Sequence, residues 1–495
     1  MARSFQNALK WAYIGSWGDK GFSALFVIIL AAILGPRDFG TVSIAAAYIG
    51  FLQLFLDQGL GAALIQRKNL EQEHLDAVFW MDILLSLVLI AFSLLLGRQW
   101  ARVNHAPGAG VVIAALSPCI LIEALAMVQM AHLRRDMDFR SLALRGNASV
   151  IASGLIGLGL AFAGFRVWAL VAQQLAKDAI SLALLWRLSP WRPRLEFSWK
   201  HLRDLIGFSI PNFIGQLGTY ADAQGSSVAL GVLFGPVAVG LYRLGERITN
   251  SVITMAMASI QSVSFSEFSR LQDDREAVRR SVLHCIRLSG AVTVPALAGL
   301  AAVSRPLMAT LGAKWAPASG VLTILCVAGM VMVFTFFTGP LLQALGRPRD
   351  AAILEWIRVG AGVAALVLTG VLVRNSAVSR QLLGIALSRL GAALLVAGPL
   401  FVAILLKVCR IPFRTFLASV WPSAAASFCA VCAVRLLGSF AFLNAVKPVL
   451  QLAAEVALGA AAGLGALLLL DRELQASLKG MWQRTWKLSE GVASL

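Results

Sequence analysis

Charged residues are scarce in this sequence. They make up 14% of its 495 residues, whereas apolar residues make up 58% and the mean hydropathy is +0.77. A soluble domain carries about a quarter charged residues, so the composition excludes a soluble protein and indicates a membrane protein. Acidic residues are the scarcer kind, 25 against 43 Lys and Arg. The basic residues lie between apolar segments rather than in one patch, so we expect no nucleic acid as a partner.

Cysteine and histidine are also few. The six cysteines lie mostly in or beside apolar segments, which argues against a disulfide framework. Cys429 and Cys432 have the spacing of a redox pair or half a metal site, but no second pair of ligands accompanies them. A membrane acyltransferase would need a histidine within the membrane, but the histidines all lie near expected loops: His74, His105, His132, His201 and His284. We predict no catalytic residue, no cofactor and no metal site.

Long apolar segments dominate the chain instead. About fourteen of them, between residues 13 and 470, reach the roughly 20 residues that a helix needs to cross a membrane. They are continuous rather than alternating, so we expect helices and not barrel strands. If the N-terminus is cytoplasmic, the inside loops carry about three times as many Lys and Arg as the outside loops. The sequence therefore predicts an all-α multi-pass membrane protein with both termini in the cytoplasm and no cleaved signal peptide.

One short motif occurs twice. The frame Gly-Pro-x-x-x-Gly stands at residues 35–40 and again at 235–240. Each copy follows the first helix of a six-helix set, which predicts two lobes repeated in parallel, with two further helices at the end. We expect an N-terminal six-helix lobe at 1–187, a basic cytoplasmic linker at 188–204, a C-terminal six-helix lobe at 205–406, and two additional helices with a cytoplasmic tail at 407–495.

Several ionisable side chains fall inside the apolar segments. Such a group costs at least about 2.5 to 3.5 kcal/mol at a helix centre on insertion scales, so it usually lines a cavity or pairs with another charge. The anion-binding candidates for a cavity are the basic residues Lys20, Arg243, Arg247 and Arg389. Polar residues at helical spacing would complete its wall: Asn212, Gln216, Thr219, Asp222, Asn250 and Thr254. Asp57 and Asp222 are the candidates for coupling to an ion.

A purely structural role for these charges stays open. Arg243 lies three residues before Glu246, the spacing of an ion pair on one helix. Lys177 stands next to Asp178 and its long side chain can extend to the membrane surface. In that case the charged residues would stabilise helices and bind no substrate.

A stretch near the N-terminus carries a family resemblance. Residues 34–80 contain a run of short motifs: Gly35-Pro36, Asp38-Phe39-Gly40, Asp57-x-Gly59-Leu60-Gly61, Ala63-Leu64-Ile65-Gln66 and Phe79-Trp80. This stretch resembles the polysaccharide transporter family of bacterial oligosaccharide-lipid flippases, within the multidrug/oligosaccharidyl-lipid/polysaccharide exporter superfamily. The resemblance implies a Wzx-like carrier in the bacterial inner membrane. Such a carrier turns a polyprenyl-diphosphate-linked repeat unit to the outer leaflet by alternating access, for exopolysaccharide or lipopolysaccharide assembly.

The expected partners are that lipid-linked oligosaccharide and membrane lipids, with a polysaccharide polymerase and export machinery as candidate protein partners. Two other classes stay open. A multidrug exporter of the same superfamily would favour an acidic or apolar cavity, whereas the candidate cavity here is basic. A polytopic glycosyltransferase or polymerase usually carries its catalytic groups on a large outside loop, and each outside loop here is short.

Overall fold

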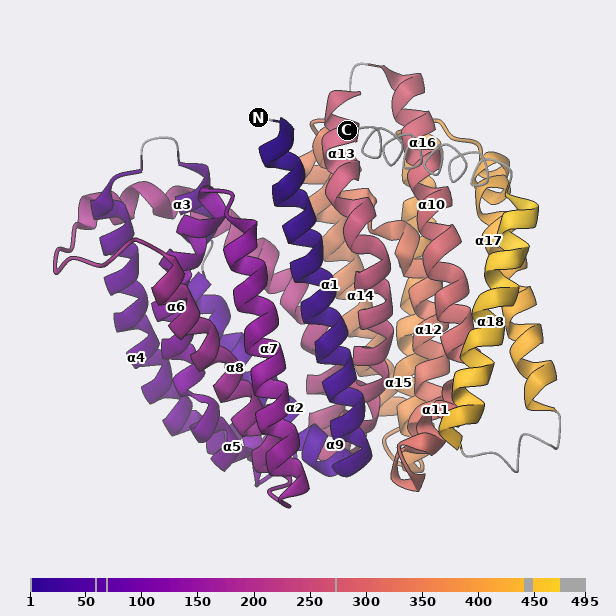
Figure 1. Cartoon of the computed structure of the whole chain (residues 1–495), viewed down its shortest axis with the longest axis horizontal. Helices are drawn as coiled ribbons and strands as arrows, with labels where there is room; N and C mark the ends of the chain where they lie inside the picture. The colour runs from indigo at the N-terminus through magenta and orange to yellow at the C-terminus, as the bar shows by residue number, and fades with distance from the viewer. Residues whose placement is uncertain (1, 58–59, 68–69, 272–273, 440–447, 472–495) are drawn as a thin grey trace, which may run out of the picture. The chain divides into compact units, whose positions relative to one another are not determined.

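The computed structural model is helical throughout the residues that it describes, which are 2–57, 60–67, 70–271, 274–439 and 448–471. Figure 1 shows the helices in chain order. They are α1 (Ala2–Ile33), α2 (Pro36–Asp57), α3 (Leu60–Gln66), α4 (Gln72–Val103), α5 (Ala109–Leu116), α6 (Pro118–Arg135), α7 (Phe139–Phe162), α8 (Val167–Leu188), α9 (Trp199–Arg270), α10 (Arg275–Ala302), α11 (Ser304–Thr310), η1 (Ala313–Trp315), α12 (Ala318–Thr335), α13 (Thr338–Ala344), α14 (Pro348–Leu372), α15 (Val378–Ala392), η2 (Ala393–Ala397), α16 (Gly398–Lys407), α17 (Phe413–Gly438) and α18 (Pro448–Leu470). The predicted all-α class is confirmed.

Twelve candidate membrane spans are present among the described residues, judged by length and composition. The predicted number of about fourteen is not confirmed. Two predicted spans, 205–229 and 237–263, fall within α9, where a single candidate covers Phe213–Met257. A third, 167–187, coincides with α8, which is not among the twelve.

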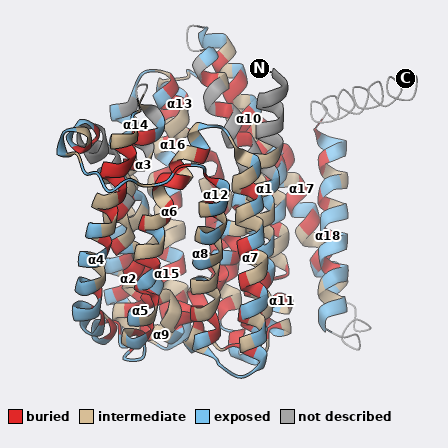
Figure 2. Cartoon of the chain, turned by 60° about the vertical axis from the view of Figure 1, so that its left-hand side comes forward, coloured by how far each residue is buried: buried red, intermediate tan, exposed pale blue. Residues whose placement is uncertain are grey.

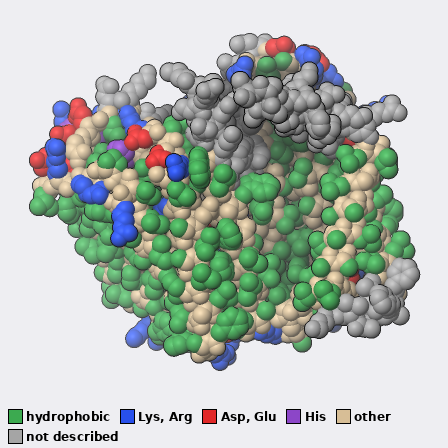
Figure 3. Space-filling model, viewed as in Figure 1, with side chains coloured by type: hydrophobic (Ala, Val, Ile, Leu, Met, Phe, Trp, Pro, Cys, Tyr) green, Lys and Arg blue, Asp and Glu red, His purple; other side chains and the backbone are tan. Residues whose placement is uncertain are grey.

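The lipid-facing surface of the helices is visible in the burial pattern. Along α4, large apolar side chains such as Leu84, Val88 and Leu95 are exposed, and Figure 2 shows that exposed face. The face of the molecule in Figure 3 is mostly hydrophobic, with charged side chains gathered toward the ends of the helices. Exposed apolar surface of this extent marks contact with lipid rather than with water.

The described residues form two compact units. One comprises Met1–Ser251, Leu311–Val321 and Ala352–Ala392, and the other comprises Val252–Thr310, Leu322–Ala351 and Ala393–Leu495. We call them unit 1 and unit 2 and describe each by itself. The lobe boundaries expected from the sequence stay a prediction.

Two apolar clusters hold the first part of unit 1 together. In one, Leu52 of α2 packs with Ile113 of α5 and Ile120 of α6, all at most 2% exposed. In the other, Phe79 at the start of α4 packs with Trp191, which follows α8. Burying side chains of this size contributes about 1.5 to 3 kcal/mol each to the stability of the fold, so these clusters hold the helices against one another.

The two copies of the Gly-Pro frame meet in unit 1. Pro36 opens α2, and Gly235, with φ of 77°, interrupts α9 so that Pro236 opens a second helical segment. A Cβ on Gly40 would lie 1.7 Å from the Pro236 carbonyl oxygen, and one on Gly240 would lie 1.8 Å from the Pro36 carbonyl oxygen. Only glycine fits at either position, because the two backbones are in contact. The repeat therefore marks a symmetric helix crossing.

Unit 2 is built around α10, α17 and α18. Ala291, Ala426 and Leu467, one from each helix, form its small apolar core. Gly459 of α18 lets Val434 of α17 approach closely, since a Cβ at Gly459 would lie 2.8 Å from Val434 Cγ2. Small residues of this kind let transmembrane helices approach without a hydrophobic driving force.

Candidate functional site

A cluster of charged residues joins three helices of unit 1. Arg358 of α14 donates from Nη1 to Asp222 Oδ2 of α9 at 3.0 Å. Arg389 of α15 donates from Nη1 to the backbone oxygen of Asp222 at 3.0 Å, and the same atom lies 3.9 Å from Asp222 Oδ1. Arg358 also binds Glu355, one turn earlier on α14. These side chains are about four-fifths buried except Glu355, which is 42% exposed.

The cluster is electrically balanced, since two arginines face two carboxylates. Asp222 was a candidate for ion coupling and Arg389 a candidate for anion binding, but the structure pairs them with protein groups. Asp222 is engaged by both arginines. A buried pair is costly to break, because the partner that remains keeps its desolvation penalty. The geometry therefore favours a structural role for this cluster, bracing α9 against α14 and α15.

Sequence reasoning missed Arg358 as a member of this cluster. Arg358 was not among the candidate residues, and it lies within the candidate span Arg349–Leu372. The available signal was its position inside the apolar segment 350–373, together with Glu355 three residues earlier.

A second group of charges lies on α1 and the later part of α9. Arg243 donates to Glu246 at 2.7 Å, which is the ion pair that sequence spacing had left open. Lys20 is half exposed and lies 3.8 Å from Asp19. Arg247 is exposed, and its charged neighbours are Arg243 and Asp19. Within this group three basic residues face two acidic ones, which leaves one positive charge in excess.

Arg247 and Lys20 are the basic residues of this group that remain accessible. The guanidinium of Arg247 makes no hydrogen bond or ion pair with another side chain in the described part of the chain. An accessible guanidinium offers several N–H donors in a planar fork, which suits phosphate oxygens. Anion binding by Lys20, Arg243, Arg247 and Arg389 stays a prediction, and among them Arg389 lies against Asp222.

A cavity of about 650 Å³ lies among α1, α2, α6, α7 and α8 of unit 1. Its charged lining residues are Asp19, Glu123, Arg134, Arg145, Lys177 and Asp178. Arg145 donates to Ser181 Oγ at 3.2 Å and Gln174 donates to Asp178 Oδ2 at 2.9 Å. A cavity of this size is in the range of small-ligand sites, and its mixed lining supplies both donors and acceptors.

The cavity as a whole was not predicted. Lys177 and Asp178 had been noted, with a structural pairing left open, and both line it. Arg134, near the end of α6, and Arg145, near the start of α7, were not among the candidate cavity residues. Asp19 lines the cavity and is also a charged neighbour of the two accessible basic residues, Lys20 and Arg247.

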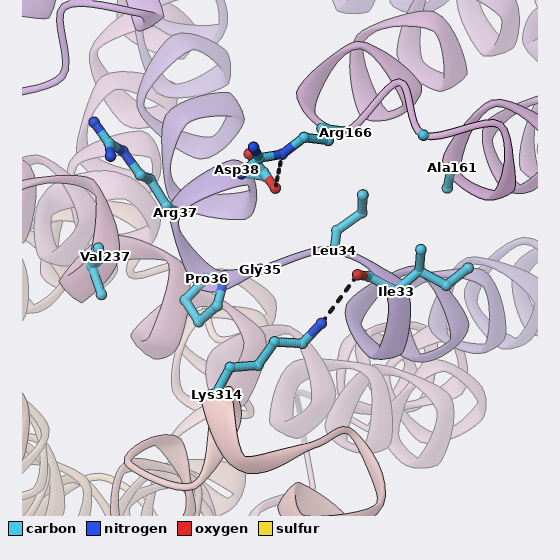
Figure 4. A pocket seen from close by; sticks show the side chains of 11 residues that line it. Ile33, Leu34, Gly35, Pro36, Arg37, Asp38, Ala161, Arg166, Val237 and Lys314 are labelled. Carbon is cyan, nitrogen blue, oxygen red and sulfur yellow. Dashed lines mark hydrogen bonds and ion pairs between the residues drawn. The ribbon is translucent and has the colours of Figure 1, made fainter.

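A smaller pocket of about 550 Å³ surrounds the first Gly-Pro turn (Figure 4). Lys314 donates to the carbonyl oxygens of Ala32 and Ile33 at 3.0 and 3.1 Å, so it caps the C-terminal end of α1. Asp38 is turned toward Arg166, at 3.7 Å, while Arg37 points away from that pair. Lys314, Asp38 and Arg166 therefore stabilise the turn between α1 and α2.

The other polar residues predicted for the cavity wall lie along α9. Thr219 and Asn250 of unit 1 and Thr254 of unit 2 are exposed, and Gln216 is half-buried. The side chains of Asn212 and Asp57 lie outside the described residues. The cavity wall that the sequence predicts from these residues stays a prediction.

Comparisons with known proteins place this architecture. The family model described as "Polysaccharide biosynthesis protein" matches residues 29–320. The succinoglycan biosynthesis transport protein ExoT of Rhizobium meliloti is 26% identical over 356 residues, which cover 72% of each chain. The lipopolysaccharide biosynthesis protein WzxC of Escherichia coli is 23% identical over 348 residues, 69% of this chain and 70% of its own. The fold resembles that of the lipid II flippase MurJ in an inward closed conformation, with a TM-score of 0.73 at 13% identity, covering 92% of this chain and 98% of that one.

Proposed function

Because this chain belongs to the polysaccharide biosynthesis protein family, we propose that it turns a polyprenyl-diphosphate-linked oligosaccharide across the bacterial inner membrane. Transport in succinoglycan biosynthesis and a role in lipopolysaccharide biosynthesis are what its relatives' names state. Their substrates come to this chain only by analogy. The proposed product is an exopolysaccharide or a lipopolysaccharide, and no covalent chemistry is involved.

The single observation that carries this proposal is that two accessible basic residues, Lys20 and Arg247, have as a charged neighbour Asp19, which lines the charged cavity. A diphosphate and its sugars cannot enter hydrocarbon unaided, because each polar group that loses its water without a new partner costs several kcal/mol. Arg and Lys would receive the diphosphate oxygens, and the polar cavity would receive sugar hydroxyls. The prenyl tail would stay in the lipid.

We propose that transport proceeds by alternating access, with the contact between Gly40 and Gly240 as the pivot. The basic linker at 188–204 is hydrogen-bonded to α4 at three points. Trp80 and Gln72 donate to the carbonyl oxygens of Arg194 and Arg192 at 2.6 and 3.1 Å, and the Arg194 amide donates to Asp76 Oδ1 at 3.0 Å. A segment held in this way supports rigid-body motion better than bending.

The orientation is also part of the proposal. Both termini lie in the cytoplasm, so the cavity, which is lined by the end of α6 and the start of α7, opens toward the cytoplasm. A polysaccharide polymerase and the export machinery are its proposed protein partners.

Binding of a diphosphate lipid tests the proposed site. The purified protein in detergent is heated with undecaprenyl diphosphate or with undecaprenol, and the melting temperature Tm is compared. We expect the diphosphate alone to raise Tm and Arg247→Gln to weaken its binding by roughly 10- to 100-fold, since a charge-assisted hydrogen bond is worth about 1.5 to 3 kcal/mol. Arg102→Gln, at the exposed end of α4, is the control. Equal shifts with both lipids would contradict the proposal.

A further inference from the structure

We propose that Glu71, His74 and His201 form a binding site for one Zn²⁺ ion. The sequence analysis predicted no metal site, and His74 and His201 are far apart in the chain. In unit 1, however, Glu71 directly precedes α4, His74 lies in the first turn of α4, and His201 lies in the first turn of α9. One ligand atom from each of the three residues lies within 4.8 Å of the others.

The individual contacts within this group are close to those of a metal site. His201 Nε2 lies 3.2 Å from Glu71 Oε2. The centroids of the two imidazole rings are 4.5 Å apart, with the ring planes at 73°. Zn²⁺ binds imidazole nitrogen and carboxylate oxygen at about 2.0 to 2.2 Å, so tetrahedral ligand atoms are about 3.4 Å apart. Glu71 Oε2 and His201 Nε2 are already near that separation, and all the ligand atoms lie within 4.8 Å of one another, so binding requires shifts of at most about 1.4 Å.

His74 supplies the second observation that points to a ligand. It is only 1% exposed, and its Nε2 atom has no hydrogen-bond partner among the described residues. A buried polar atom without a partner costs about 1 to 3 kcal/mol. Its Nδ1 accepts a long hydrogen bond of 3.3 Å from the Glu71 amide. To bind a metal, Nε2 must carry no proton, so the ring proton would move to Nδ1. The weak hydrogen bond at Nδ1 would then be replaced by a metal bond at Nε2.

The surroundings of His201 also fit a metal ligand. Its Nδ1 lies 2.6 Å from Ser198 Oγ, so the outer nitrogen is hydrogen-bonded and Nε2 is directed at Glu71. Metal-bound histidines usually carry such a hydrogen bond on their second nitrogen. Arg67, whose charge acts on His74, lies 3.3 Å from Asp204, which offsets its repulsion of a cation.

A bound Zn²⁺ would fasten the start of α4 to the start of α9. Glu71 and His74 come from one side of this junction and His201 from the other, 127 positions later in the chain than His74. The segment between α8 and α9, already hydrogen-bonded to α4 through Arg194, would then be fixed at a further point. The three protein ligands leave the fourth position to water.

Titration with Co²⁺ tests the site, because Co²⁺ replaces Zn²⁺ in such sites and is coloured. The full-length protein in detergent is stripped of metal with a chelator and titrated, and Zn²⁺ is then added. We expect one equivalent of Co²⁺ with the visible absorption of a four-coordinate site, displaced by one equivalent of Zn²⁺. His201→Ala and Glu71→Gln should each weaken binding by about 100-fold or more, since even the outer partners of metal ligands contribute 10- to 100-fold.

The matched control is His284→Ala, which removes an exposed histidine of α10. It should bind Co²⁺ as the wild type does. The melting temperature of each metal-free variant shows that folding is retained, and Glu71→Gln decides the matter if His201→Ala unfolds. The proposal is overturned if the wild type takes up no Co²⁺ at one equivalent, or if a folded His201→Ala or Glu71→Gln variant binds it as tightly as the control.

Discussion

The contact between the two Gly-Pro frames yields the sharpest stability prediction. Gly40→Ala would place a methyl group 1.7 Å from the Pro236 carbonyl oxygen, and Gly240→Ala would place one 1.8 Å from the Pro36 carbonyl oxygen. The backbone nitrogens of Gly240 and Gly40 would lie at 2.9 and 3.0 Å from the same methyl groups. Backbone atoms cannot turn aside as side chains do, so the two helices must move apart.

The size of the effect follows from two opposing contributions. An ordinary contact between a methyl group and a carbonyl oxygen is about 3.4 Å, so the helices must separate by more than about 1 Å at this point, and overpacking of this kind costs about 1 to 3 kcal/mol. Replacing a helical glycine by alanine gains about 0.5 to 1 kcal/mol from lower backbone entropy in the unfolded chain. We therefore expect each variant to lose about 1 to 2 kcal/mol of stability.

The assay is thermal unfolding of purified protein in one detergent, with Gly159→Ala as the control. No heavy atom lies within 4 Å of a Cβ built at Gly159 of α7, so that variant should melt at the wild-type temperature or slightly above it. Gly40→Ala and Gly240→Ala should both melt below the wild type. A melting temperature at or above that of Gly159→Ala for either variant would refute the close contact.

Three further predictions concern other contacts of the structure. Asp222→Asn leaves Arg358 and Arg389 without their shared carboxylate, while the buried arginines keep their desolvation cost. We expect a loss of about 1 to 3 kcal/mol of stability, measured by thermal unfolding. A variant as stable as the wild type would show that this cluster does not stabilise the contact of α9 with α14 and α15. Trp315→Phe removes the 2.6 Å hydrogen bond from the indole to the Ala31 carbonyl oxygen and should lower the free energy of unfolding by about 1 kcal/mol or more, measured in the same way. Its control is Trp17→Phe on the exposed face of α1, which should leave the free energy of unfolding nearly unchanged. Burial raises the pKa of the Cys409 thiol to about 11. Because maleimide reacts with the thiolate, its labelling rate in a variant that keeps only this cysteine should rise about tenfold per pH unit from pH 7 to 10. A labelling rate that levels off near pH 8.5 would contradict the raised pKa.

Much of the fold was predictable because membrane helices leave a strong composition signal. The apolar segments identify the helices, since backbone polar groups must be satisfied within each segment in lipid. Their number was harder, because Gly235 interrupts α9 without ending it and because α8 carries Lys177 and Asp178 within an apolar run. The Gly-Pro repeat predicted related parts of the chain, but the contact between the two copies depends on tertiary packing.

The candidate site was predictable only in part, for a physical reason. Helical spacing shows which residues share a face of one helix, as with Arg243 and Glu246, but not what faces them from another helix. The pairing of Asp222 with Arg358 and Arg389 is of that second kind. The same is true of His74 and His201, which approach each other only because α4 and α9 begin at the same place in unit 1.

The central claim, that this chain turns a diphosphate-linked oligosaccharide across the membrane, is tested most directly in proteoliposomes. A fluorescent polyprenyl-diphosphate oligosaccharide is placed in one leaflet and its arrival in the other is followed, at matched protein amounts. The account predicts flipping by the wild type, a loss of roughly tenfold or more in Arg247→Gln, and little change in Arg102→Gln. Absence of flipping by the wild type, together with export of a cationic dye or formation of a glycosylated product from a labelled donor, would contradict it.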